Sequence, residues 1–201
     1  MSNIPHFFNK IIASGDGWFD FHNLYYNVVK DATEDRKYIF AEIGCWKGAS
    51  TSFMAVEIAN SEKDIDFYCI DTWKGSTEHR DRDNGAFDPM CFEQDGIFPI
   101  FMKNMEPVKD YIKPIQKSSL EASYDFPDDY FDFVFIDASH EYEHVKTDIE
   151  NWFPKVKSGG VLAGHDYGWK GVVDALKEFA EVKSLTVYEL PHDGPSWLIQ
   201  K

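Results

Sequence analysis

The segment Phe131–Tyr167 reads FDFVFIDASHEYEHVKTDIENWFPKVKSGGVLAGHDY and decides the fold. Phe131–Ile136 is a run of aromatic and β-branched residues, which is typical of a strand buried on both faces. A helix is expected over about Glu141–Phe153, where apolar residues recur at helical spacing. Ser158–Gly160 is then expected to break the chain before a second strand begins at Val161–Ala163. Strand, helix and strand in this order predict a parallel βαβ unit with a right-handed crossover.

Polar side chains follow both of these strands. Asp137 ends the first strand, and the pair His165-Asp166 ends the second. Because neighbouring parallel strands end at the edge where open α/β sheets bind ligands, the three side chains should lie close together. Two carboxylates and one imidazole suit Mg²⁺, Mn²⁺ or Ca²⁺, or else Fe²⁺ or Zn²⁺. A metal site is the prediction; the alternative is that Asp137 caps the next helix and His165-Asp166 begin a turn.

The rest of the chain repeats the alternation of strands and helices. Further strands are expected over Tyr38–Ile43, Ile65–Ile70, Tyr111–Gln116, Leu185–Leu190 and Ser196–Ile199. Further helices are expected over Phe19–Val29, Ala49–Asn60, Ile100–Glu106 and Gly171–Ala180. This order predicts one α/β domain over residues 1–201, with a doubly wound, mostly parallel seven-stranded sheet and helices on both faces.

Two segments fall outside this alternation. Residues 1–37 are expected to form an N-terminal arm and a helix. The arm, Met1–Gly17, reads as irregular and aromatic-rich, and it packs either on the domain or on a second subunit of a homo-oligomer. Residues 75–100 lack periodicity and mix charged residues, glycines, prolines and phenylalanines. A stretch of that length in a compact domain is usually functional or else disordered, and we predict a lid or substrate loop.

The composition restricts the class of protein. The 201 residues are 43% hydrophobic, which indicates a globular chain. Twenty Lys and Arg residues against 35 Asp and Glu residues give a net charge of −15, which disfavours a nucleic-acid partner. The three cysteines form no CxxC, and the apolar surroundings of Cys45 and Cys69 predict buried thiols in a reducing compartment. Without a membrane-length apolar run or a basic leader, we expect a cytoplasmic protein with no membrane partner.

A glycine-containing turn follows the strand Tyr38–Ile43. Its pattern is Glu42-x-Gly44-x-x-x-Gly48, between a strand and a helix, and it either lets a ligand approach the backbone or only serves packing. It lacks the glycines of a dinucleotide fingerprint. Asp71 ends the next strand, where an acidic side chain accepts the ribose hydroxyls of a nucleoside. Together the turn and Asp71 predict an adenosine-like ligand.

The residues from His140 to His144 match H-E-x-x-H, the pattern of zinc peptidases. That motif needs both histidines within a helix, one turn apart, and a third ligand further on. His140 lies close to a strand end, so only His144 is expected to be helical. Glu178 is the downstream glutamate available on paper, but a further strand separates it from the motif. We therefore prefer a surface or packing role for His144.

Taken together, these positions resemble the class I S-adenosylmethionine-dependent methyltransferases, from Tyr38 to the C-terminus. The resemblance is closest to small metal-dependent O-methyltransferases, of the catechol type and of the type that modifies macrolide sugars and aminocoumarins. Glu42, Gly44 and Gly48 resemble their cofactor loop, and Asp71 resembles their ribose acid. The strand that ends at Asp137 resembles the one below the methyl donor.

The resemblance implies S-adenosyl-L-methionine as cofactor, a divalent metal such as Mg²⁺, and a small hydroxylated acceptor. Asp137 and the pair His165-Asp166 fall on the metal-binding positions, although these families usually carry aspartate where His165 stands. His140 occupies the place of the catalytic lysine of the catechol type, which implies a general base.

Ser118 and Ser119 fall where these enzymes contact adenine. The alternatives from other classes are a metal-dependent hydrolase that uses Asp137, His165 and Asp166, and the H-E-x-x-H peptidase. A further alternative is a nucleoside-binding module without catalysis.

Overall fold

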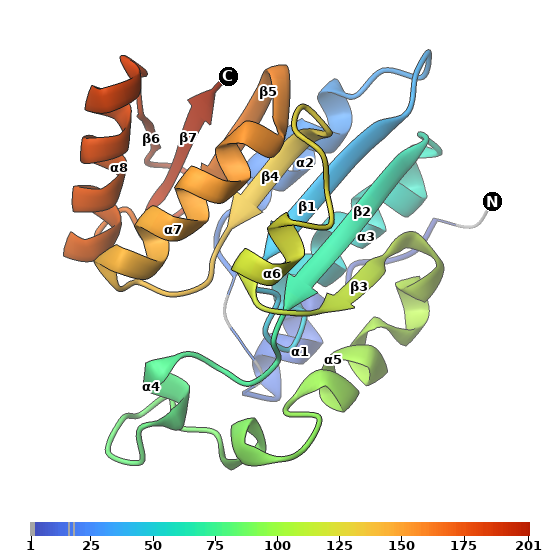
Figure 1. Cartoon of the computed structure of the whole chain (residues 1–201). Helices are drawn as coiled ribbons and strands as arrows, with labels where there is room; N and C mark the ends of the chain where they lie inside the picture. Colours follow the sequence, from blue (N-terminus) through green and yellow to red (C-terminus); the bar gives the residue numbers. More distant parts are fainter. Residues whose placement is uncertain (1–2, 16, 18) are drawn as a thin grey trace.

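The computed structural model describes residues 3–15, 17 and 19–201, and these residues form one seven-stranded sheet with helices on both faces. The strands lie in the order β3-β2-β1-β4-β5-β7-β6 (Figure 1). Those from β3 to β5 run parallel, and β7 pairs antiparallel with β5 and with β6. Their bounds are Tyr38–Ile43 (β1), Ile65–Asp71 (β2), Lys113–Gln116 (β3), Phe131–Ile136 (β4), Val156–Gly164 (β5), Tyr188–Leu190 (β6) and Ser196–Gln200 (β7). The predicted fold class is confirmed.

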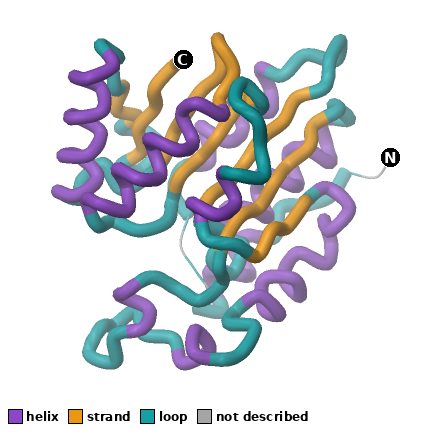
Figure 2. The backbone as a smooth tube through the Cα atoms, in the orientation of Figure 1, coloured by secondary structure: helices purple, strands orange, loops and turns teal. Residues whose placement is uncertain are grey.

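Helices cover each face of the sheet, as the tube in Figure 2 shows. One face carries α1 (Phe8–Ala13), α2 (His22–Asp31), α3 (Ala49–Ser61) and α5 (Phe98–Met105); the other carries α6 (Ser119–Ser123), α7 (Tyr142–Trp152) and α8 (Lys170–Lys183). Successive strand residues face opposite sides, so Phe40 and Phe133 join the first core while Ala41 and Val134 join the second. This alternation explains why the central strands read as continuous apolar runs.

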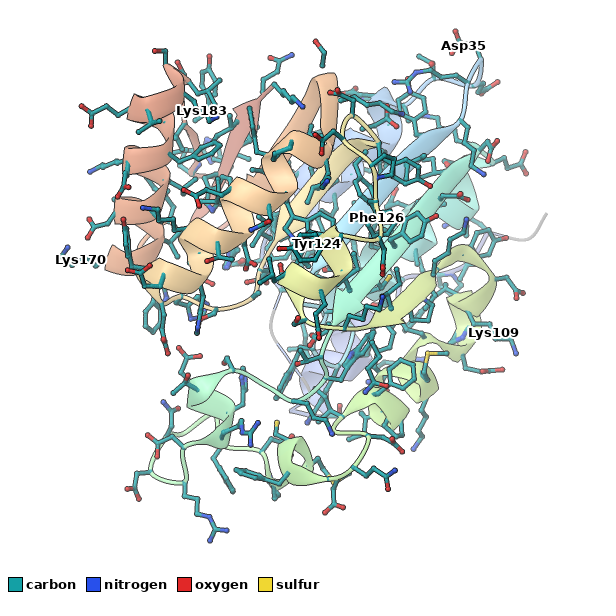
Figure 3. The ribbon with its side chains drawn as sticks, in the orientation of Figure 1. Asp35, Lys109, Tyr124, Phe126, Lys170 and Lys183 are labelled. Atoms are coloured by element: carbon teal, nitrogen blue, oxygen red, sulfur yellow. The ribbon has the colours of Figure 1, made fainter. Side chains whose placement is uncertain are left out.

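The second core is rich in aromatic rings. Phe126, labelled in Figure 3, packs edge-on against Phe131 at 4.8 Å between ring centroids and lies 6.1 Å from Trp152. Lys170 and Lys183 mark the two ends of α8 in the same view and are exposed. The buried indole of Trp152 thereby ties α7 to the sheet beneath it.

Two expectations about the chain path were wrong. The arm is not irregular throughout, because Phe8–Ala13 forms α1, whose apolar residues recur at helical spacing and pack on the first core. Ser158–Gly160 does not break the chain either, because β5 runs through it with an irregular register against β4. Backbone bonds between Lys201 and the pair Gly159-Gly160 (2.7 and 3.0 Å) extend the ladder there. Residues 1, 2, 16 and 18 lie outside the described residues.

The short helix α6 was not predicted, and the other predicted elements differ from the structure only at their ends. The third strand starts at Lys113 because a 3₁₀ helix, η2 (Glu106–Tyr111), occupies the preceding residues. A further 3₁₀ helix, η3 (Phe153–Lys155), follows α7. The strand β6 is shorter than the expected Leu185–Leu190, because Leu185 still donates its N–H to the carbonyl of Ala180 in α8 (2.9 Å).

The segment between β2 and α5 carries two short helices, α4 (Thr77–Arg80) and η1 (Pro89–Phe92). It extends beyond the carboxyl ends of the parallel strands (Figure 1). Cys91 and Ile97 of this segment are buried, so the segment packs against the rest of the domain. Its role as a lid stays a prediction.

The buried thiols predicted for Cys45 and Cys69 are confirmed, and Cys91 is buried and free as well. In the described part of the chain, no helix is both long enough and apolar enough to cross a membrane.

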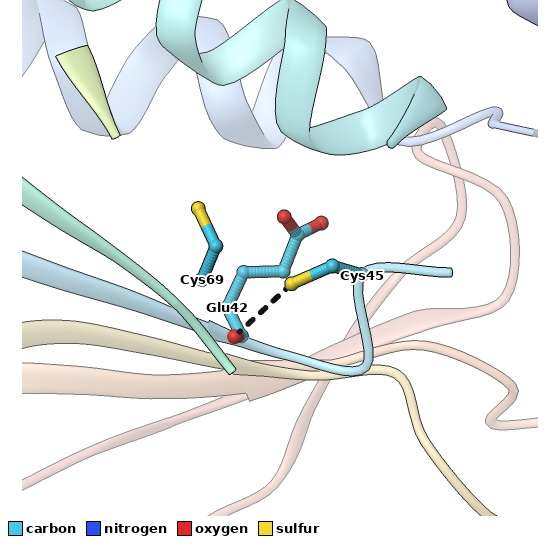
Figure 4. Close-up of side chains that lie close together, drawn as sticks. All are labelled: Glu42, Cys45 and Cys69. Atoms are coloured by element: carbon cyan, nitrogen blue, oxygen red, sulfur yellow. Dashed lines mark hydrogen bonds between the residues drawn. The ribbon is translucent and has the colours of Figure 1, made fainter. Parts of the chain in front are cut away.

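A carboxylate is buried between β1 and α3. Glu42 is fully buried, and its side chain points from the sheet towards α3 (Figure 4). Three hydroxyl groups donate hydrogen bonds to its two oxygens: those of Tyr25 at 3.0 Å, Ser50 at 2.5 Å and Thr51 at 2.5 Å. Burial raises the pKa of Glu42 from 4.5 to about 7, although these three bonds oppose the shift. Glu42 therefore joins α2 and α3 to the central strand.

Replacement of Glu42 by Gln should change how stability depends on pH. Since the pKa is higher in the folded state (about 7) than in the unfolded state (4.5), Glu42 contributes stability below pH 4.5 that is lost as pH rises through 7. Gln does not titrate, so relative to wild type the variant should gain up to roughly 3 kcal/mol between pH 4.5 and pH 8. Urea unfolding of both proteins at the two pH values measures this. An equal difference between the proteins at both would contradict the raised pKa.

Candidate functional site

A cleft lies at the carboxyl ends of β1, β2 and β4, where the strand order reverses from one side of the sheet to the other. It consists of two adjoining cavities of about 190 and 70 Å³, which share Gly44, Trp46, His79, Asp137 and Ala138. Both volumes are below the range of about 300–1,000 Å³ that ligand pockets usually have. We therefore expect the segment 75–100, which supplies His79, to shift when a ligand enters.

The backbone around position 44 leaves room only for glycine. Gly44 has φ +90°, and a Cβ atom there would lie 2.0 Å from the carbonyl oxygen of Asp137. Gly48, with φ +93°, precedes α3, and a Cβ atom there would meet the side chain of Met105. The sequence left open whether these glycines serve packing or ligand approach. Backbone packing demands glycine at position 44, and the left-handed conformation favours glycine at position 48. Gly44 also lines both cavities.

Asp71 organises the same turn. Its Oδ2 accepts the backbone N–H groups of Cys45 (2.9 Å) and Trp46 (2.8 Å), and its Oδ1 accepts that of Trp73 (2.7 Å). Burial raises the pKa of Asp71, although these backbone bonds oppose the shift. A carboxylate has about four acceptor sites. These three backbone groups occupy three of them, and the Thr72 side chain also interacts with the carboxylate. A ligand hydroxyl at this edge of the cleft would therefore take the place of Thr72.

The other residues predicted to bind the cofactor are placed differently. Ser119 lines the larger cavity, and its hydroxyl bridges Asp148 (2.5 Å) and the indole N–H of Trp152 (2.8 Å). Ser118 caps α6 by bonding with Glu121. Glu42 does not line either cavity, because its carboxylate lies beneath α3.

A cluster of possible metal ligands stands at the ends of β4 and β5. Asp137, His140 and Asp166 each offer one ligand atom, and these three atoms lie within 4.8 Å of one another. The Nε2 atom of His140 lies 2.7 Å from the Oδ2 atom of Asp166. Asp166 adopts a left-handed conformation (φ 61°), uncommon for a residue other than glycine. The sequence predicted His165 as the third member, whereas the structure brings His140 to the two carboxylates.

His165 lies behind the cluster. Its Nε2 atom lies 2.9 Å from Asp20, its Nδ1 atom lies 3.3 Å from Asp166, and its ring packs 5.0 Å from Phe21. The side chain is only 6% exposed. His165 therefore contacts one carboxylate of the cluster from the core side.

The charges within the cluster are strongly coupled. Burial opposes charge on His140, but its contacts with Asp166 and Glu78 outweigh burial and raise its pKa to about 9. Burial also raises the pKa of Asp137 to about 6, helped by Asp166 and opposed by His165 and His140. For Asp166, contacts with the two histidines overcome burial and hold the pKa below its usual range. The protons on the two histidines thus balance the negative charge of the carboxylates in this cluster.

This donor set fits a divalent cation. Two carboxylates and one imidazole whose ligand atoms converge can replace protons by an ion such as Mg²⁺ or Mn²⁺. Among the described residues a second convergent group exists, Glu42 with Cys45 and Cys69. That group is fully buried and its carboxylate already accepts three hydroxyl groups, which makes it a poor site for an ion from solution.

The H-E-x-x-H match does not form a zinc site. His140 and Glu141 precede α7, which begins at Tyr142, so only His144 lies in the helix, as the sequence predicted. The Nδ1 atom of His144 lies 3.0 Å from the hydroxyl of Ser139, and the side chain is 60% exposed. The motif is thus a coincidence of sequence.

Sequence reasoning missed three side chains around the cluster. Glu78 and His79 come from α4; the ring of His79 stacks on Trp46 at 3.8 Å between centroids. Trp169 stacks on His140 at 4.7 Å and is 51% exposed. Glu78 and His79 belong to a segment without periodicity, so no sequence pattern pointed to them. Trp169 follows the end of β5 by only five residues, and this closeness was the one signal in the sequence.

Comparison with known proteins identifies the family of this chain. Residues 41–167 match the family described as "Methyltransferase domain". A protein of Sinorhizobium fredii (strain NBRC 101917 / NGR234), "Uncharacterized protein y4gI", is 26% identical over 162 residues. The match covers 81% of this chain but only 16% of that protein's length.

Solved structures share the fold at low sequence identity. The O-methyltransferase NovP superimposes with a TM-score of 0.70 at 16% identity, covering 90% of this chain and 78% of NovP. A putative caffeoyl-CoA O-methyltransferase from Staphylococcus aureus gives 0.65 at 16%, covering 96% and 90%. An O-methyltransferase from Bacillus cereus, solved in complex with SAH, gives 0.63 at 16%, covering 100% and 94%.

Gly44→Ala should destabilise the fold as well as alter the cleft. The added methyl group would enter a left-handed backbone position and press on the carbonyl of Asp137, which together should cost roughly 2–4 kcal/mol. Urea unfolding measures the loss. The matched control is Gly85→Ala, since a Cβ atom at Gly85 meets no atom within 4 Å, and it should stay within about 0.5 kcal/mol of wild type. Equal stability of the two variants would show that the turn can relax.

Proposed function

The chain belongs to the methyltransferase domain family, and from that premise we propose that it transfers a methyl group from S-adenosylmethionine to a hydroxyl group of a small molecule, assisted by a divalent cation. One observation carries this proposal: Asp71 and the cluster of Asp137, His140 and Asp166 border the same pair of adjoining cavities. The O-methyltransferases with the same fold point to oxygen as the acceptor atom. The net charge of −15 favours a small, non-anionic acceptor over nucleic acid.

The cofactor half of the site is the turn after β1 together with Asp71. Backbone bonds to Asp71 fix Cys45 and Trp46 in the turn before α3, and the part of the Asp71 carboxylate that contacts the Thr72 side chain suits a ribose hydroxyl. Ser119 lies at the position where the resemblance implies contact with adenine. Its hydroxyl already bonds with Asp148 and Trp152. We assign Glu42 a supporting role beneath the turn.

The cation half of the site is Asp137, His140 and Asp166. The methyl donor would supply the electrophile, and a divalent cation beside it would lower the pKa of the acceptor hydroxyl. The two carboxylates and the imidazole would hold this ion, so that the reaction gains mainly from positioning. Both a general base and a metal ligand need the neutral imidazole, so protonation does not separate the two roles. The convergence of the His140 side chain with the carboxylates of Asp137 and Asp166 favours His140 as a ligand.

Other expectations remain open proposals. A homo-oligomer through the arm is less favoured than the sequence suggested, because the arm's apolar residues Ile11 and Phe8 pack on this chain's own core. A cytoplasmic location agrees with the three free cysteines. The hydrolase and peptidase alternatives gain no support from the family or from the placement of His144.

Calorimetry with S-adenosylhomocysteine and its deoxy analogues tests the cofactor assignment. The analogue that lacks the hydroxyl group accepted by Asp71 should bind about 10-fold to 100-fold more weakly, the usual loss of a hydrogen bond to a charged group. A probe is altered here instead of the protein, because Asp71→Ala would also leave three backbone N–H groups without an acceptor. Equal binding of the 2′-deoxy and 3′-deoxy analogues and the parent would place the ribose elsewhere. No binding of the parent would refute the proposed cofactor.

Mn²⁺ binding to single variants tests the cation site. Asp137→Ala and His140→Ala should each lose affinity by more than about 100-fold, because a ligand is removed, while His165→Ala should lose only about 10-fold, as an outer partner does. Elemental analysis and titration of each variant measure this, beside the rate of methyl transfer to hydroxylated acceptors. If His140→Ala keeps the ion and His165→Ala loses it, the set Asp137, His165 and Asp166 predicted from the sequence is correct. His140 then returns as the candidate base.

A further inference from the structure

The short helix α4 touches the cation site directly. The Oε1 atom of Glu78 lies 3.1 Å from the Nδ1 atom of His140, although the two residues are 62 positions apart in the sequence. One position earlier, the hydroxyl of Thr77 donates to the carboxylate of Glu141 at 2.9 Å. The segment between β2 and α5 is therefore attached to the loop after β4 at two adjacent points.

The imidazole of His140 is held on three sides. Its Nε2 atom faces Asp166 at 2.7 Å, its Nδ1 atom faces Glu78, and Trp169 stacks on its ring. A neutral imidazole that binds an ion through Nε2 must carry its remaining proton on Nδ1, and a carboxylate at Nδ1 fixes both this tautomer and the ring orientation. Glu78 stands at the atom where such an acceptor is needed.

We propose that Glu78 is the positioning residue for His140, and that through this contact cation binding is coupled to closure of residues 72–97 over the cleft. This inference rests on the proposed function, because it needs His140 to bind a cation. Glu78 itself is not in the convergent group formed by Asp137, His140 and Asp166, so it supports a ligand instead of being one. Its second oxygen, Oε2, accepts a bond from Ser76 (3.0 Å), which holds the carboxylate towards His140.

The same segment also contacts the cofactor half of the site. His79, next to Glu78, stacks on Trp46 in the turn after β1. Lys47 of that turn pairs with Asp88 of the segment at 2.7 Å. A segment fixed to the cation side by Glu78 and to the cofactor side by His79 can close fully only when both halves of the site are in order. The ion would thus help to shape the wall against which the acceptor lies.

Titration with Mn²⁺, by calorimetry and by electron paramagnetic resonance, tests the role of Glu78. Glu78→Ala should weaken Mn²⁺ binding about 10-fold to 100-fold, the usual effect of an outer partner of a metal-binding histidine. Glu78→Gln keeps an acceptor oxygen and should fall between wild type and Glu78→Ala. Glu78 is a partly exposed residue of a short helix, so both variants should fold, and thermal melting checks this.

Two matched controls come from the same segment. Thr77→Val breaks the neighbouring contact with Glu141 but leaves Glu78 and His140 together. Asp83→Asn removes one negative charge from an exposed position of the segment. Both should bind Mn²⁺ within about twofold of wild type, which separates the orientation of His140 from general effects of the segment or of charge.

Hydrogen exchange supplies a readout that a merely structural role would not change. In wild type and in Thr77→Val, saturating Mn²⁺ should slow amide exchange in residues 72–97. In Glu78→Ala, Mn²⁺ at a concentration that saturates this weaker site should leave exchange in the segment unchanged, because the link is missing.

The outcomes are distinguishable. Wild-type affinity in Glu78→Ala, or equal protection of the segment by Mn²⁺ with and without Glu78, would overturn the inference and leave the proposed function intact. Loss of the ion in Glu78→Ala and Glu78→Gln as complete as in Asp137→Ala would make Glu78 a ligand instead. A wild-type protein that binds S-adenosylhomocysteine but no Mn²⁺ would overturn both this inference and the cation part of the proposed function.

Discussion

The hydrogen-bond ladder of the central sheet continues one residue beyond the strands, and the site depends on this continuation. Gly44 donates its N–H to Ile70 at 2.8 Å, and Asp137 donates to Ile43 at 2.8 Å. One strand further, His165 donates to Ile136 at 3.1 Å. Each loop therefore leaves the sheet with a fixed direction. The backbone alone therefore brings the carboxylates of Asp137 and Asp166 close to each other.

Two carboxylates, Glu42 fully buried and Asp71 half-buried, then stiffen the turn after β1. Asp71 gathers backbone N–H groups of the turn after β1, while Glu42 gathers hydroxyl groups of α2 and α3 beneath it. Buried carboxylates are costly unless such donors surround them, so their presence implies that the turn is tightly specified. The cluster of Asp137, His140 and Asp166 is built differently, from charged groups that compensate one another. Hydrogen bonds thus make the turn after β1 rigid, whereas the charge of the cluster depends on the protons that it holds.

The sheet, and the edge of the sheet that carries the site, could both be predicted from the sequence for a physical reason. Strands buried on both faces are apolar throughout, and parallel strands end at a common edge, so Asp71, Asp137 and Asp166 could be assigned to it. The convergence of His140 with Asp137 and Asp166, with His165 behind them, could not be foreseen. It depends on the left-handed turn at Asp166, which directs that carboxylate towards the loop after β4 while His165 stays against Phe21. Backbone angles of this kind leave no periodic pattern in the sequence.

The backbone conformation of Asp166 also limits how this protein can diverge during evolution. In the left-handed region, asparagine and glycine are tolerated, whereas other side chains strain the chain by roughly 1–2 kcal/mol. A lineage that loses the carboxylate here while keeping an unstrained fold must therefore pass through asparagine or glycine. Because Asp71 and the turn after β1 are built separately, such a descendant would keep its cofactor cradle. Homologues with asparagine or glycine at this position would then show whether the lineage can lose the proposed cation site and keep this turn.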